Sequence, residues 1–445
     1  MAKDMTVGKP GRTLFFFAVP MVLGNLFQQF YNIIDSIIVG NFVGADALAA
    51  VGASASITFL FVAIATGLSI GSSVIISQYF GAKRYGEMKT GIYTLLFTAL
   101  AVSALLTGIG ILGTDGILRF MNTPENIFSD ASMYLKIYFG GMIFLFLYNS
   151  LTAVFNAMGD SVSPLVFLAF SSCCNIVLDL YFVRSLHMGV AGVAWATLIS
   201  QGISMVISFL WMNVRMRKLH IKDAFRLFDV RILKTICRIA IPSMLQQSMV
   251  SVGILLVQRL VNGYGSVVMA GYAAATKIDN IAILPMVNVG SAVSTFTAQN
   301  IGADKPERVK KGLNSGMIMS VGIAIVVSAV LFLFADVFVG AFMDTQSNRE
   351  AIAVGVDYLQ VVGMCYILMG IMNSYTGILR GAGDVKWFLA VTLFNLGARV
   401  ALAYLLSPVF GYRAIWWSIP IGWVIGLVLG IIRYRNGGWK DAKLI

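Results

Sequence analysis

The chain has 445 residues, of which 58% are hydrophobic and only 12% are charged. Soluble domains carry about 25% charged residues, so this composition excludes an ordinary soluble protein. The formal net charge of +12 does not indicate nucleic-acid binding, because the basic residues lie in short segments between apolar runs rather than on a soluble face. We therefore expect a membrane protein with no nucleic-acid partner.

Apolar runs separated by short polar segments predict twelve transmembrane helices, since each span needs roughly 20 apolar residues. The first run follows basic residues as in a signal peptide, but it contains Asp35 and lacks a small-residue cleavage site, so we expect a retained helix. The predicted spans are 14–39, 47–77, 91–113, 131–157, 163–185, 190–213, 233–262, 267–298, 311–334, 353–378, 387–408 and 412–434.

The two halves of the chain repeat one pattern. Pro20 in Ala-Val-Pro recurs as Pro242 in Ala-Ile-Pro, and Gln78-Tyr-Phe-Gly-Ala recurs as Gln299-Asn-Ile-Gly-Ala. A Gly-Asp pair ending at Asp160 recurs in the second half as Gly383-Asp384. The separations along the chain agree to within a few residues, which indicates a parallel repeat about an axis along the membrane normal.

The repeat predicts an all-α membrane protein of two pseudo-symmetric six-helix bundles. We place the N-terminal lobe at 1–218, a cytoplasmic linker at 219–232 and the C-terminal lobe at 233–445. Most of the 32 Lys and Arg residues lie on the side of both termini. The positive-inside rule therefore puts both termini in the cytoplasm of a multi-pass protein in the plasma membrane of a prokaryotic cell.

Three predicted helices of the first half carry polar stripes. The first presents four polar groups at i, i+3, i+4 and i+7, which lie on one face of a helix. The fifth and sixth each carry a polar pair spaced i, i+4, at depths that allow all three stripes to meet in one pocket. These residues are Gln28, Tyr31, Asn32 and Asp35, then Asn175 and Asp179, then Thr197 and Gln201.

Asp35 and Asp179 are the candidate coupling residues of this pocket. Two partly desolvated carboxylates that lie close together resist simultaneous ionisation, which suits a proton-coupling device. Carboxylate, amide and hydroxyl oxygens would also suit Na⁺, so sodium is the alternative coupling ion. A purely structural role, in which the aspartates lock helices together by hydrogen bonds, is the other interpretation.

The second half has a different polar set, Lys277, Asp279 and Arg399, near the middle of their predicted spans. A structural ion-pair cluster and a role in gating both explain it. No enzyme chemistry emerges: Gly67-Leu-Ser-Ile-Gly71 matches a nucleophile-elbow pattern, but neither histidine lies in a span and the match indicates close helix packing. We expect no cofactor and no resident metal.

The pattern of repeats and polar stripes resembles the multidrug and toxic compound extrusion (MATE) family over essentially the whole chain. The resemblance rests on the first-helix Pro20 and Asp35 and on the repeated Gln-x-x-Gly-Ala and Gly-Asp motifs. It is strongest to the branch with coupling aspartates in the N-terminal lobe (DinF-like and MepA-like transporters), whose residues match Gln28, Tyr31, Asp35, Asn175, Asp179 and Thr197. The seventh-helix acid of the sodium-coupled branch is absent here.

The resemblance implies a monomeric antiporter that exports amphipathic, often cationic drugs by alternating access in exchange for protons, with membrane lipids around it. Two alternatives stay open. A lipid-linked precursor flippase of the same superfamily would need a strongly cationic cavity, for which only Lys277 and Arg399 are available. A non-transporting membrane scaffold or sensor would leave the polar stripes of the first half unexplained.

Overall fold

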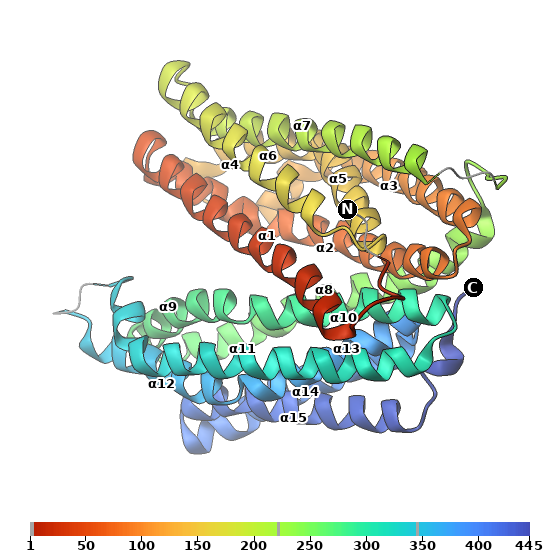
Figure 1. Ribbon diagram of the computed structural model, residues 1–445. Helices are drawn as coiled ribbons and strands as arrows, with labels where there is room; N and C mark the ends of the chain where they lie inside the picture. Colours follow the sequence, from red (N-terminus) through yellow and green to blue (C-terminus); the bar gives the residue numbers. More distant parts are fainter. Residues whose placement is uncertain (1–3, 220–222, 344–346) are drawn as a thin grey trace. The chain divides into compact units, whose positions relative to one another are not determined.

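The computed structural model describes residues 4–219, 223–343 and 347–445, and every regular element within them is helical (Figure 1). The elements up to the middle of the chain are α1 Pro10–Ile38, η1 Val39–Val43, α2 Ala45–Gly81, α3 Tyr85–Phe120, α4 Glu125–Gly140, α5 Met142–Ala157, α6 Val162–Leu180, η2 Tyr181–Ser185 and α7 Gly189–Lys218. The remaining elements are α8 Val230–Asn262, α9 Ser266–Ala282, α10 Leu284–Gly302, α11 Pro306–Gly340, α12 Arg349–Met364, α13 Tyr366–Ala382, α14 Val385–Phe410, α15 Arg413–Arg435 and η3 Lys440–Ala442.

These helices supply the twelve predicted spans. Within the described residues, ten helices are long and apolar enough to cross a membrane, with α9 and α10 forming one of them. Two further spans are bent pairs, α4 with α5 at 49° and α12 with α13 at 50°. The all-helical, twelve-span prediction is confirmed. The bends at Gly141 and Cys365 fall in the fourth span of each half, so the repeat extends to this break.

The chain divides into two compact units. Unit 1 contains Leu23–Met244, and unit 2 contains Asp4–Val22 with Leu245–Ile445. The helices α1 and α8 therefore each begin in one unit and end in the other. The predicted lobe boundaries at 1–218 and 233–445 stay a prediction, and residues 220–222 of the predicted linker lie outside the described residues.

In unit 1, α2 packs tightly against the first part of α8. A Cβ added to Gly67 would lie 2.4 Å from Met244 Cγ, and one added to Gly71 would lie 2.6 Å from the Ala240 nitrogen. Because no larger side chain fits there, the Gly67–Gly71 pattern serves helix packing, as the sequence indicates.

The segment before α8 also binds to unit 1. The backbone nitrogens of Arg226 and Asp229 donate to Thr90 Oγ1 at 3.0 Å and Thr94 Oγ1 at 3.1 Å. The Phe225 ring stacks on Tyr93, with centroids 5.9 Å apart. This segment is thus held on α3 before α8 begins.

Unit 2 holds the segment before α1 in a corresponding way. Gln299 Oε1 accepts from the Met5 nitrogen at 2.9 Å, and Lys305 Nζ donates to the Thr6 carbonyl at 3.0 Å. The Arg308 guanidinium donates to the carbonyls of Met5 at 3.0 Å and Val7 at 2.9 Å.

Met5 is fully buried in a core with Phe296, Val309 and Trp439. The repeated Gln-x-x-Gly-Ala motif therefore supplies an anchor for the N-terminal segment in this unit.

Candidate functional site

The polar face of α1 lies in unit 1, with Tyr31 and Asp35 half-buried. Asn32 is exposed and accepts a hydrogen bond from Gln28 Nε2 at 3.2 Å. Regular helical spacing explains both facts, because i and i+4 residues are neighbours on the surface of one helix. Gln28 and Asn32 therefore pair with each other, while Tyr31 and Asp35 carry the contacts with other helices.

The partners of α1 come from α6 and α7. Asn175 and Asp179, one turn apart on α6, are buried, with Asp179 fully inaccessible and Asn175 only 2% exposed. In the amide orientation that satisfies both polar atoms of Asn175, its nitrogen donates to Asp179 Oδ2 at 2.7 Å and its oxygen accepts from the Thr197 backbone nitrogen at 3.2 Å. A single amide thus joins α6 to α7 and orients the carboxyl group.

Asp35 and Asp179 meet directly: their carboxyl groups lie within hydrogen-bonding distance of each other. The hydroxyls of Tyr31 and Thr197 are hydrogen-bonded as well. The structure therefore brings together five of the sequence-predicted residues, Tyr31, Asp35, Asn175, Asp179 and Thr197. Gln201 lies half-buried one turn beyond Thr197 and does not belong to this described cluster of five.

A carboxylate only accepts hydrogen bonds, so contact between two carboxyl groups needs a proton on one of them or a cation between them. When both groups are ionised, Asp35 Oδ1 and Asp179 Oδ1 are buried acceptors that no donor from the described residues reaches. Such orphaned buried acceptors are costly. The arrangement can therefore hold a proton, or a small hard cation, between the two carboxyl groups.

Two tyrosines on α4 adjoin this cluster and were missed by the sequence analysis. Tyr134 is 9% exposed and lies close enough to Asp35, Tyr31 and Asp179 to interact electrostatically with them. Its ring stacks on Tyr138, with centroids 6.2 Å apart and planes 19° apart. Their i, i+4 spacing on one face of the fourth span was the available signal.

The polar set of the second half lies within unit 2. Asp279 Oδ1 accepts from the Tyr366 hydroxyl at 2.5 Å, and Oδ2 accepts from the Tyr358 hydroxyl at 3.1 Å. Arg399 donates to the Tyr272 hydroxyl and lies close enough to Asp279 for their charges to attract. The structure thus brings Asp279 and Arg399 into one network of tyrosines.

Lys277 is not part of that network. It is exposed, and its Nζ lies 5.4 Å from the centroid of the Phe342 ring. Residues two apart on a helix point to opposite sides, because each residue turns the helix by about 100°. Lys277 and Asp279 share a depth but not a face. Among the described residues no group of three His, Cys, Asp or Glu side chains could hold a metal ion.

Comparison with known proteins decides the family. The family described as MatE matches residues 20–181 and 242–405, two segments that begin at the repeated prolines Pro20 and Pro242. The chain belongs to the MatE family. The two matched segments of the MatE pattern correspond to the two repeated halves, so the predicted family resemblance is confirmed.

Relatives within and around the MatE family cover nearly the whole chain. The probable multidrug resistance protein YpnP of Bacillus subtilis strain 168 is 31% identical over 100% of this chain and 99% of its own length. The probable multidrug resistance protein YoeA of the same strain is 28% identical over 97% and 95%. A solved MOP superfamily transporter from Pyrococcus furiosus is 24% identical, with a TM-score of 0.89 and 98% of each chain covered. The last likeness concerns the fold.

Proposed function

We propose that this protein exports amphipathic organic compounds, many of them cationic, in exchange for protons, and that the pair Asp35 and Asp179 carries the coupling proton. The observation that carries the proposal is the direct contact between the two carboxyl groups on α1 and α6. The names of the curated relatives, which are multidrug resistance proteins, support the substrate class. Transport involves no chemical conversion of the compound.

The proposed cycle follows from two states of the carboxyl pair. With one proton bound, Asp35 and Asp179 hydrogen-bond and hold α1 against α6. With the proton lost, two adjacent carboxylates repel and α1 moves away from α6. Drug affinity is then high in one state and low in the other, so proton and drug compete through one conformational equilibrium.

The course of α1 supports its role as the moving element. The helix carries Asp35 in unit 1, while its first part, up to Val22, belongs to unit 2. A change at the carboxyl pair therefore acts on a helix that is anchored in both units. Pro20 lies at the boundary, where a proline removes a backbone hydrogen bond and weakens the helix.

The energy source depends on stoichiometry. One proton exchanged for one monovalent cation moves no net charge, so only the pH difference drives export, at about 1.4 kcal/mol per pH unit. A second proton would add the membrane potential, roughly 2.3 kcal/mol per 100 mV. We propose a monomer in the plasma membrane of a prokaryotic cell, with both termini cytoplasmic.

The test is efflux of a cationic dye from proteoliposomes under an imposed pH gradient. Asp35→Asn and Asp179→Asn should each abolish efflux, while Asp336→Asn, at an exposed acid on α11, should leave it intact. Wild-type efflux in both site variants would contradict the proposal. If a sodium gradient at clamped pH drives efflux, the coupling ion at this carboxyl pair is Na⁺ and not the proton.

A further inference from the structure

The helix α11 presents a largely exposed, apolar surface on unit 2. It is strongly apolar, and in its most apolar 18-residue window only 17% of the residues are buried. Most of its exposed side chains along the apolar stretch are large and aliphatic or aromatic, among them Ile325, Phe332, Leu333 and Val337, and Asp336 is an exposed acid among them. A spanning helix with such a surface suits contact with lipid chains.

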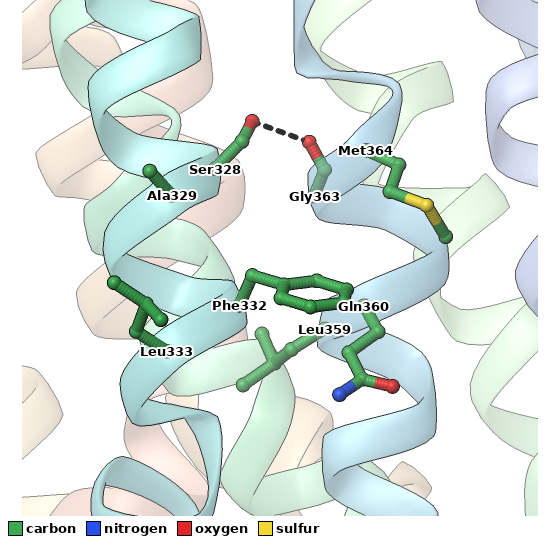
Figure 2. Close-up of a pocket in the computed structure, with 8 residues that line it drawn as sticks. All are labelled: Ser328, Ala329, Phe332, Leu333, Leu359, Gln360, Gly363 and Met364. Atoms are coloured by element: carbon green, nitrogen blue, oxygen red, sulfur yellow. Dashed lines mark hydrogen bonds between the residues drawn. The ribbon is translucent and has the colours of Figure 1, made fainter.

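Two apolar grooves flank α11. The groove beside α9 has a volume of about 390 Å³ and is lined along α11 from Val326 and Val330 to Phe338 and Phe342. The groove beside α12 has nearly the same volume, about 380 Å³ (Figure 2). The Ser328 hydroxyl, which lines this groove, donates a hydrogen bond to the Gly363 carbonyl at 2.6 Å. The two hollows are therefore alike in size and apolar lining.

They differ in charge. Lys277 precedes the groove-lining Ile278 on α9, is exposed, and places its Nζ over the ring of Phe342 at the end of the α9–α11 groove. In the α11–α12 groove the corresponding polar group is the neutral amide of Gln360. An exposed lysine on a membrane span is costly unless an anion accompanies it, and anionic headgroups attract such lysines.

The length of the groove fits a lipid chain. From Val326 to Phe338, the groove-lining residues within α11, the helix rises by about 18 Å, which exceeds the roughly 15 Å of one leaflet of the hydrocarbon core. The side chain of Lys277 brings its ammonium group to Phe342, beyond the end of α11 at Gly340, where a headgroup would sit, and the apolar lining leads away from it. A cationic drug would be repelled at this end, because the charge there is positive.

We propose that the α9–α11 groove binds one anionic phospholipid, with its phosphate at Lys277 and an acyl chain along Val326, Val330 and Phe338. The site lies in unit 2, apart from the carboxyl pair of unit 1, and does not depend on the proposed transport cycle. Its ligand is part of the membrane and not a transported compound.

Native mass spectrometry of the full-length protein with equal amounts of dioleoyl phosphatidylglycerol and dioleoyl phosphatidylcholine tests the site. The wild type should retain phosphatidylglycerol in preference. Lys277→Gln should lower the phosphatidylglycerol-bound fraction at least about threefold, which corresponds to about 0.65 kcal/mol, without changing the phosphatidylcholine fraction. Lys386→Gln, at an exposed lysine at the start of α14, is the matched control and should behave as the wild type.

Two groove variants make the test independent of Lys277. Val330→Phe fills the α9–α11 groove and should reduce retention of both lipids although the lysine remains. Gln360→Lys introduces a cation at the α11–α12 groove and should raise the number of retained phosphatidylglycerol molecules by one. Wild-type retention in Lys277→Gln or in Val330→Phe, or an equal loss in Lys386→Gln, would overturn the proposal.

Discussion

Arg433 Nε lies 2.6 Å from Asp384 Oδ2 in unit 2. The same pairing occurs in unit 1, where Arg215 Nη2 lies 2.6 Å from Asp160 Oδ2. Each acid precedes a helix, and each arginine lies near the end of the last long helix of its half. The repeated Gly-Asp motif therefore anchors corresponding helix ends in the two units.

Asp384→Asn should destabilise the protein by roughly 3 kcal/mol, because it leaves the largely buried Arg433 without its counter-charge. Asp160→Asn should have a similar effect. The matched control is Asp357→Asn, whose partner Arg413 is 66% exposed, so the loss there should stay below about 1 kcal/mol. Thermal unfolding in detergent measures all three, and equal shifts for Asp384 and Asp357 would contradict the anchoring role.

Arg308→Ala should release the N-terminal segment from unit 2. The guanidinium holds the carbonyls of Met5, Val7 and Gly8, and hydrogen bonds to a charged group contribute about 1.5–3 kcal/mol. Hydrogen exchange at the Met5 amide should accelerate at least about tenfold. Lys310→Gln, which removes only an exposed ion pair with Glu307, should leave the exchange unchanged. If the Met5 amide still exchanges slowly in Arg308→Ala, the other contacts of the N-terminal segment hold it on unit 2 without Arg308.

Gly377→Ala should be strongly destabilising. A Cβ at Gly377 would lie 2.4 Å from the Gly290 carbonyl oxygen, so α10 and α13 would have to separate. Overpacking of this kind costs about 1–3 kcal/mol or more. At Gly322 on α11 a Cβ meets nothing within 4 Å, so Gly322→Ala should be neutral or stabilising by up to about 1 kcal/mol. In thermal unfolding, Gly377→Ala should lower the unfolding temperature, and Gly322→Ala should leave it unchanged or raise it.

Asn175→Ala should slow proton-driven efflux roughly tenfold, since it removes the amide that donates to Asp179 and joins α6 to α7. Gln201→Ala is the comparison, because Gln201 belongs to the predicted stripe on α7 but lies a turn beyond Thr197. Efflux in Gln201→Ala should remain within about twofold of the wild type. If Asn175→Ala and Gln201→Ala slow efflux equally, the hydrogen bond from Asn175 to Asp179 contributes no more than the other polar residues of the predicted stripes.

The fold and the core of the candidate site could be predicted from the sequence because both follow helical periodicity. Asp35 and Tyr31, one turn apart on α1, meet Asp179 and Thr197 on helices whose polar residues repeat every four positions. The i, i+4 spacing of Tyr134 and Tyr138 is a weak signal, since tyrosines in an apolar chain mostly serve packing. Lys277 was grouped with Asp279 by depth alone, although depth along a helix does not fix the face.

The long-range contacts of the chain could not be predicted. Nothing in the apolar pattern indicates that Met5, near the N-terminus, is buried in the same core as Trp439 near the C-terminus. The bends at Gly141 and Cys365 also carry no proline, which is the usual sequence signal for a broken helix. Such features depend on which side chains of distant segments fit together, and a single sequence does not reveal this.

The central claim is that drug and proton compete through Asp35 and Asp179. The most direct measurement is calorimetric titration of the purified protein with a monovalent organic cation such as ethidium in buffers of different ionisation heat, which counts the protons released. Binding should release about one proton in the wild type and none in the Asp35→Asn, Asp179→Asn double variant. Binding without proton release in the wild type, or the same release in the double variant, would contradict the account.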